Sequence, residues 1–157
     1  MRRTVLLLVL LVGSVLGFAP APVFRERPDD SKAVLRRLQG TWTVSRYEQG
    51  GRTVYGKGEA YTIVIEKDHL TYFRALNGSS LVKWNSLTLK LDPNPTPAEI
   101  DLISSHDPNI ILSGVYDLKG DTLRMVYQIN TDGKKDREKA LVNPSPKSYF
   151  MQLERQP

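Results

Sequence analysis

The residues best suited to bind a metal ion are two histidines, His69 and His106, in a chain without cysteine. Two imidazoles and a carboxylate such as Asp101 form a ligand set that Zn²⁺ accepts. Their spacing does not require these residues to meet, and both histidines fall in predicted turns. We therefore expect no metal site and no cofactor. The absence of cysteine also excludes disulfides, thiolate chemistry and a lipid-modified cysteine anchor.

A calcium-binding loop is suggested by Asn130, Asp132 and Gly133. When the segment is aligned on the glycine, Gln128 takes the first ligand position and Lys139 takes the twelfth. An EF-hand needs a bidentate glutamate at that twelfth position. The segment is therefore not expected to bind calcium.

Acid–base chemistry would need paired carboxylates, and Glu99 and Asp101 alternate along one predicted strand. Side chains two apart share one face of a strand, and a solvated outer face is the favoured interpretation. The sequence contains no Gly-x-Ser-x-Gly motif and no phosphate-binding loop, and no histidine is placed near a plausible serine nucleophile. We expect no catalytic residue and no enzymatic activity.

The N-terminus has the order of segments found in secretory signals. Arg2 and Arg3 precede an uncharged apolar run from residue 5 to residue 12, and small residues follow. The apolar part is shorter than the roughly 20 residues that a membrane span needs. Residues 1–21 are therefore predicted to be a signal peptide or an N-terminal anchor. We expect a periplasmic or secreted protein that contacts a membrane only through this segment, if it is uncleaved.

Charge argues against nucleic-acid binding. The formal net charge is +5, and without Arg2 and Arg3 the surplus of basic over acidic residues falls to three. Lysines and arginines are interspersed with acids, as in residues 134–139 (KKDREK). Such a mixed run is typical of a solvated loop rather than of a stripe that follows phosphates.

The remainder of the chain is long enough for one domain. Residues 22–30 are rich in proline and charge, and are predicted to form a tether. Capping side chains at Asp29, Asp30 and Ser31 then predict a short helix that ends near Gly40. The domain is assigned to residues 31–157.

Alternation of apolar and polar residues, with turn residues between, predicts eight strands from residue 41 onward. Lys67-Asp68-His69 and Asn77-Gly78-Ser79 are predicted turns, and the proline-rich residues 92–97 form a loop without ladder pairing. The predicted strands are Thr41–Glu48, Ala60–Glu66, Leu70–Arg74, Leu81–Leu91, Glu99–Ser104, Ile110–Leu118, Thr122–Ile129 and Ser148–Leu153.

No long amphipathic helix is available to cover a sheet, so these strands must bury their apolar face against one another. A sandwich and a closed barrel both achieve this. Successive hairpins with short turns favour the barrel, because closure removes exposed edges. The predicted fold is all-β: an eight-stranded antiparallel up-and-down barrel with a short N-terminal helix, preceded by the signal peptide.

Gly40-Thr41-Trp42, at the head of the first strand, resembles the Gly-x-Trp signature of lipocalin-like barrels. The resemblance implies that Trp42 closes one end of the barrel and that a basic residue near the last strand stacks over it. Arg155 is the candidate, and Arg124 is a poorer one. Gly40, Trp42 and Arg155 are thus predicted to be structural residues.

Longer segments are similar to a lipocalin-like domain of unknown function that is expanded in planctomycetes. The similar segments are residues 38–42, 98–102, 114–123 and 153–155. That family has a Pro-Thr-Glu-Phe-like segment before its last strand, which residues 137–141 (REKAL) replace here. The resemblance implies the fold and assigns no catalytic or binding residue.

The interior of such a barrel is either filled by side chains or able to hold one small ligand. A filled interior or a small dry cavity is favoured, and we expect a cell-envelope module that acts on another protein through its loops. The alternative is a small, largely apolar ligand bound in the barrel mouth. The candidate cavity residues are Tyr61, Ile63, Tyr72, Leu89, Tyr116, Met125, Tyr127 and Met151.

Overall fold

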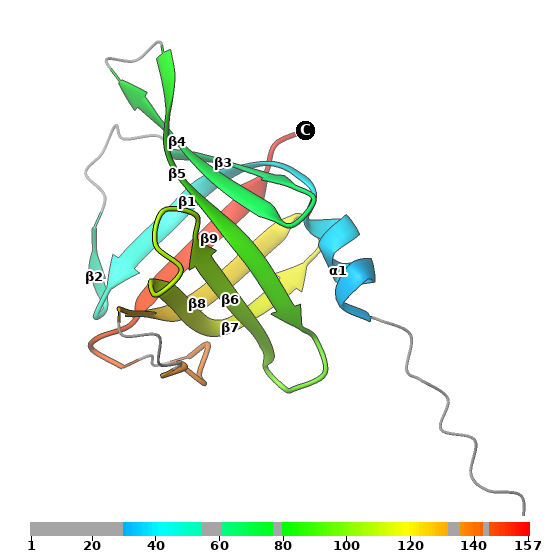
Figure 1. The fold of residues 1–157 in the computed structure, drawn as a ribbon, viewed down its shortest axis with the longest axis vertical. Helices are drawn as coiled ribbons and strands as arrows, with labels where there is room; N and C mark the ends of the chain where they lie inside the picture. The colour runs from blue at the N-terminus through cyan, green and yellow to red at the C-terminus, as the bar shows by residue number, and fades with distance from the viewer. Residues whose placement is uncertain (1–29, 55–60, 77–79, 132–135, 143–144) are drawn as a thin grey trace, which may run out of the picture.

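The computed structural model describes residues 30–54, 61–76, 80–131, 136–142 and 145–157 (Figure 1). The predicted signal peptide, all of the tether except Asp30, and the predicted Asn77-Gly78-Ser79 turn lie outside the described residues. Asp30 is the first residue of helix α1.

The elements are one short helix and nine strands within the described part of the chain. Their bounds are α1 (Asp30–Leu38), β1 (Gly40–Gln49), β2 (Arg52–Thr53), β3 (Tyr61–Glu66), β4 (His69–Leu76), β5 (Ser80–Asp92), β6 (Ala98–Ser104), β7 (Ile111–Lys119), β8 (Thr122–Asn130) and β9 (Tyr149–Arg155).

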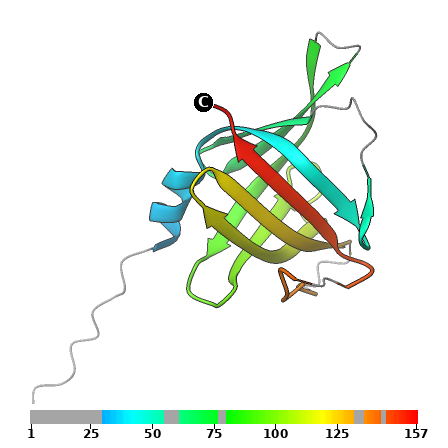
Figure 2. The same cartoon turned by 180° about the vertical axis from the view of Figure 1, so that it is seen from behind.

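The strands form one antiparallel sheet in which each long strand pairs with its neighbours in the sequence. The sheet closes because β1 also pairs with β9, from Trp42 opposite Arg155 to Gln49 opposite Tyr149. The eight strands β1 and β3 to β9 thus form an up-and-down barrel, visible from both sides in Figures 1 and 2. The predicted eight-stranded antiparallel barrel with a short N-terminal helix is confirmed.

Two local predictions were wrong. The two-residue strand β2 was not predicted; it follows Gly50 and Gly51, whose positive φ angles of 55° and 77° turn the chain back onto the end of β1. A strand of two residues is too short to show alternation. His69 was placed in a turn, but it opens β4 opposite Glu66, because residues 67 and 68 are enough for the turn.

The core fills the half of the barrel nearest α1. The helix covers this end, and Leu38 at its C-terminus is fully buried while Val34 packs against the core. Side chains from every long strand contribute to this cluster. Its fully buried members include Trp42, Ile63, Ile65, Leu70, Leu102, Met125 and Leu153. This end, under α1, is called the closed end below.

Candidate functional site

The closed end is sealed by Trp42 and Arg155. The Trp42 side chain is fully buried, and its indole nitrogen donates a hydrogen bond to the Leu38 carbonyl at 2.9 Å. The Arg155 guanidinium lies 4.2 Å from the centre of the indole ring and donates to the carbonyls of Arg37 and Gln39. The last strand is thereby joined to the end of the helix.

Gly40 makes this arrangement possible. Its φ of 119° is a conformation that residues with a side chain rarely adopt. A Cβ atom at this position would also lie only 3.3 Å from Nη1 of Arg155. The three residues predicted to be structural therefore lie together.

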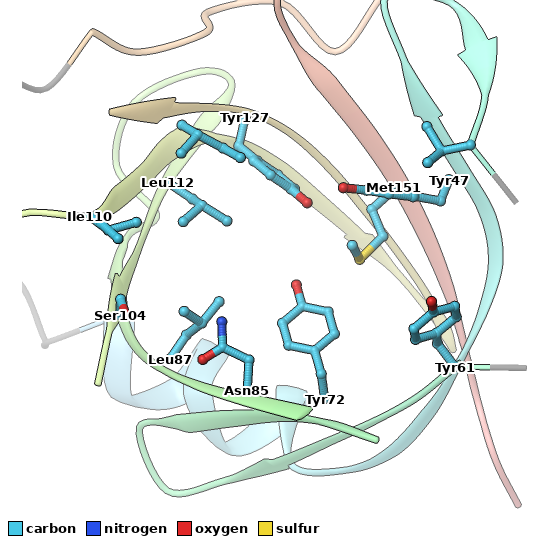
Figure 3. Close-up of a pocket in the computed structure, with 12 residues that line it drawn as sticks. Tyr47, Tyr61, Tyr72, Asn85, Leu87, Ser104, Ile110, Leu112, Tyr127 and Met151 are labelled. Carbon is cyan, nitrogen blue, oxygen red and sulfur yellow. The ribbon is translucent and has the colours of Figure 1, made fainter. Parts of the chain in front are cut away.

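The opposite end of the barrel contains a cavity of about 550 Å³. Figure 3 shows side chains from the strands around its wall pointing into it. This is within the range of small-molecule sites. The lining residues are Tyr47, Val54, Tyr61, Tyr72, Asn85, Leu87, Ser104, Ile110, Leu112, Tyr127, Ile129 and Met151. The barrel interior was predicted to be filled or to hold a small dry cavity, which describes the closed end but not this one, which is called the open end below.

Tyrosine hydroxyls supply most of the polar atoms of the cavity. The hydroxyl of Tyr72 points toward the centre, and those of Tyr47 and Tyr127 lie across from it (Figure 3). Burial raises the pKa of Tyr72 above its usual value, repulsion from the ionised form of Tyr47 adds to the rise, and a hydrogen bond with Tyr127 opposes it. Burial also raises the pKa of Tyr47, again against a hydrogen bond with Tyr127. These phenols remain neutral at physiological pH and can both donate and accept hydrogen bonds.

A stack of three aromatic rings holds two of these tyrosines in place. The ring of Tyr149 lies between Tyr47 and Tyr127, at centroid distances of 6.0 and 5.6 Å, and both pairs are nearly parallel. The rings come from β9, β1 and β8, so the stack crosses three neighbouring strands. Each such pair contributes about 0.5–1.5 kcal/mol beyond its buried area. Two of the hydroxyls are therefore fixed before any ligand arrives.

Asn85 and Ser104 line the other side of the cavity. The Asn85 amide oxygen accepts the backbone N–H of Ser86, and its amide nitrogen points into the cavity (Figure 3). The Ser104 hydroxyl accepts the N–H groups of His106 and Asp107. Asn85 thus offers the cavity a hydrogen-bond donor.

Among the described residues that line this cavity, none is acidic, basic or histidine. The apolar side chains between the polar atoms are aliphatic or methionine, such as Leu87, Leu112 and Met151. A charged ligand would lose its hydration without gaining an opposite charge from this lining. The lining therefore suits a neutral molecule that is mostly apolar and carries one or two hydrogen-bonding groups.

Four of the eight predicted cavity residues line the cavity, namely Tyr61, Tyr72, Tyr127 and Met151. The other four belong to the packed core and are not among the residues that line this cavity: Ile63, Leu89, Tyr116 and Met125. All eight alternate inward as predicted. Alternation identifies the inner face of a strand but contains no information on depth along the barrel axis, and depth decides between core and cavity.

Tyr47 was missed for a different reason. From Val44, strict alternation would point Arg46 inward and Tyr47 outward. The pairing of β1 with β9 shifts between Val44 and Arg46, and such a bulge reverses the alternation beyond it. Asn85 does continue the alternation of Leu89 and Leu87, so the sequence contained a signal for it.

The outer face of the barrel carries a segment that we call the strap, defined as residues 136–142 and 145–148. Arg137 of the strap donates to Asp101 at 2.8 Å and contacts Glu99 at 3.1 Å, and it also donates to the carbonyls of Ile100 and Gly114. Asp101 is consequently buried. The prediction of a solvated outer face for Glu99 and Asp101 was wrong, because their partner is distant in the sequence.

Glu138 is the second attachment of the strap, and it is only 8% exposed. Its carboxylate accepts the hydroxyl of Ser148 and the backbone N–H groups of Lys139, Ala140 and Ser145. Burial by itself would raise the pKa of Glu138, but these hydrogen bonds outweigh it and lower the pKa to about 2. The prediction of a solvated loop was therefore wrong for Arg137 and Glu138, whereas Asp136 and Lys139 are exposed.

The candidate metal ligands do not gather. Both histidines are exposed, and the His69 ring contacts its neighbour Asp68 at 2.7 Å. Among the described residues, no three metal-binding side chains lie close enough to share an ion. Within the same part of the chain, no helix is long and apolar enough to cross a bilayer.

Comparisons with known proteins returned no match from family models, from curated proteins or from solved structures.

Proposed function

We propose that this protein binds a small, neutral, largely apolar molecule in the open end of the barrel. The observation that carries the proposal is the cavity of about 550 Å³, whose described lining residues are uncharged. Tyr47, Tyr72 and Tyr127 would bind one polar group of the ligand, and Asn85 would donate to a second. Leu87, Leu112 and Met151 would contact the apolar part.

Several features support a cavity whose lining is held in place before a ligand binds and does not collapse. Tyr149 holds Tyr47 and Tyr127 by stacking from its place on β9. The packed core at the closed end and the strap outside fix the strands that carry the lining. Rigid support of this kind lowers the entropy that a site loses when it binds.

Membership of the lipocalin-like domain family belongs to this proposal as well. The barrel topology, the Gly40-Thr41-Trp42 start of β1 and the stacking of Arg155 on Trp42 support it. Export to the periplasm or the exterior, with residues 1–21 as signal peptide or anchor, rests on the sequence pattern. A binding role, and not catalysis, agrees with the uncharged cavity.

Interaction with another protein through the loops is the second candidate function. One observation favours it: Val142 of the strap is 75% exposed and borders two surface grooves. An isolated valine is a small contact area, so the cavity remains the stronger basis for function.

The neutral fluorescent probe N-phenyl-1-naphthylamine tests the proposal by titration. We expect saturable binding to the wild-type protein and at least tenfold weaker binding to Leu112→Trp, because the indole would occupy the cavity. Ile110→Trp repeats the test from a neighbouring position. Val142→Trp is the matched control, since it adds the same side chain to the exposed strap. Equal binding by all four proteins would contradict the proposal.

Native mass spectrometry of the protein purified from its own source supplies the identity of the ligand. We expect a co-purified neutral species on the wild-type protein and its loss in Leu112→Trp. A wild-type protein that retains only solvent, and that also fails to bind the probe, would contradict a ligand-binding role.

A further inference from the structure

The exposed apolar side chains of the described residues are concentrated around the open end. Five of these large apolar side chains are exposed, and four of them lie at this end. Val54 follows β2, Leu81 and Val82 lie on the β4–β5 hairpin, and Ile129 lies near the end of β8. The fifth is Val142 of the strap. Val54 and Ile129 also line the cavity, so its apolar interior continues onto the surface around the opening.

The β4–β5 hairpin extends beyond the body of the barrel, on the side away from α1 (Figures 1 and 2). Leu81 and Val82 are consecutive in this hairpin, where they pair with Ala75 and Arg74. Consecutive residues of a strand face opposite sides, so both faces of the hairpin carry an exposed apolar side chain. A two-stranded hairpin surrounded only by water would ordinarily keep polar residues on at least one face.

The charge of the same region is positive. Arg52 on β2 and Lys83 on β5 are exposed, and Arg74 lies over the ring of Tyr61 at 5.8 Å. The described residues 52–54, 71–75 and 81–83 include no acidic residue. Acids lie elsewhere at this end: Glu48 pairs with Arg46 at 2.7 Å, Asp107 accepts the N–H of Asn109, and Asp136 is exposed near the end of β8.

We propose that the open end of the barrel docks on an anionic lipid surface, with the exposed apolar side chains entering the headgroup region and Arg52 and Lys83 near the lipid phosphates. Apolar contact and basic residues act together in reversible membrane association of this type. Charge complementarity selects this occupant. A neutral apolar partner would gain nothing from the cations, and a basic partner would be repelled.

This inference deepens the proposed function, on which it rests for its purpose: a docked open end would let a poorly soluble ligand pass between membrane and cavity without crossing water. It places membrane contact on the barrel, whereas the sequence analysis placed it only on the N-terminal segment. Docking itself needs no ligand, so the two proposals can fail separately.

Co-sedimentation with vesicles tests the docking. The wild-type protein, without the predicted signal segment 1–21, is mixed with vesicles of phosphatidylcholine alone or of phosphatidylcholine with phosphatidylglycerol. We expect binding to the anionic vesicles that high salt weakens, and little binding to the neutral ones. No binding to anionic vesicles, or equal binding to both kinds, would overturn the proposal.

Two matched pairs of variants locate the docking surface. Lys83→Glu is expected to weaken vesicle binding about tenfold, while Lys119→Glu, an equal charge change at the exposed end of β7, leaves it within twofold. Leu81→Ser is expected to weaken binding several-fold, whereas Val142→Ser does not. Equal losses within either pair would overturn the assignment of the surface to the open end.

A last comparison separates docking from ligand binding. Leu112→Trp, whose cavity is filled, is expected to bind anionic vesicles as the wild type does while it loses the fluorescent probe. Lys83→Glu is expected to bind the probe normally in solution. If Leu112→Trp lost vesicle binding while still folded, the cavity and not the rim would mediate the lipid contact, and the docking proposal would be wrong.

Discussion

The two ends of this barrel differ in where their polar groups make hydrogen bonds. At the closed end the indole N–H of Trp42 and the guanidinium of Arg155 bond to carbonyls of the chain itself. At the open end the hydroxyl of Tyr72 and the amide nitrogen of Asn85 point into a cavity. The groups of the closed end are bonded within the chain and contribute to stability. The Tyr72 hydroxyl also shares a hydrogen bond with Tyr127, but a hydroxyl can both donate and accept, so it keeps capacity for a ligand. The comparison separates residues that stabilise the fold from residues that suit recognition.

Replacement of the central side chain of the closed end should have the largest effect. Trp42→Ala is expected to lower the free energy of unfolding by about 3–5 kcal/mol, because a large buried side chain is lost and a cavity remains. Chemical denaturation measures it. Val54→Ala, at the half-exposed rim of the open end, is the control and should change stability by less than about 1 kcal/mol. Similar losses in both variants would remove the distinction between the ends.

Low pH should destabilise the strap. The Glu138 carboxylate, like the polar groups of the closed end, is hydrogen-bonded within the protein. The folded pKa of Glu138 is about 2, below its usual 4.5, so the unfolded state binds the proton more readily. Its contribution, at most about 3 kcal/mol, is therefore complete above pH 4.5 and is lost as the pH falls from there toward 2. Denaturation curves at several pH values measure the slope.

Glu138→Gln should reduce that slope in the acid range, and the exposed Glu66→Gln provides the control. If the wild type and Glu138→Gln lost stability in parallel between pH 4.5 and 2, the strap would not be held by this carboxylate. The hydrogen bonds of the Glu138 carboxylate within the protein would then not contribute to stability as proposed.

The smallest effect on stability is expected at the open end. Tyr72→Phe removes one hydroxyl from the cavity and should change the free energy of unfolding by less than about 1 kcal/mol. The same variant should weaken a ligand that bonds to this hydroxyl several-fold, by about the 0.5–1.5 kcal/mol of one hydrogen bond. Calorimetry with the co-purified ligand measures this loss. A variant that lost stability as Trp42→Ala does would show that Tyr72 is part of the core.

The sequence by itself determined the barrel and its order of strands. Period-two alternation and turn residues located all eight long strands, because both signals are local and each strand pairs with its sequence neighbour. The seal at the closed end was also predicted, from the resemblance of Gly40-Thr41-Trp42 to the Gly-x-Trp signature. The closing pair β1–β9 brings Gly40, Trp42 and Arg155 together.

Only the tertiary structure decided which inward residues line a cavity. Tyr116 and Tyr127 look alike in sequence and both belong to the packed core, yet only Tyr127 also lines the cavity of the open end, because depth along the axis depends on strand tilt and register. The bulge that turns Tyr47 inward and the ion pair between Arg137 and Asp101 likewise depend on pairing across the fold. Local periodicity indicates which face of a strand a residue occupies. Cavities, and ion pairs between residues far apart in the sequence, depend on how the strands and the strap pack together.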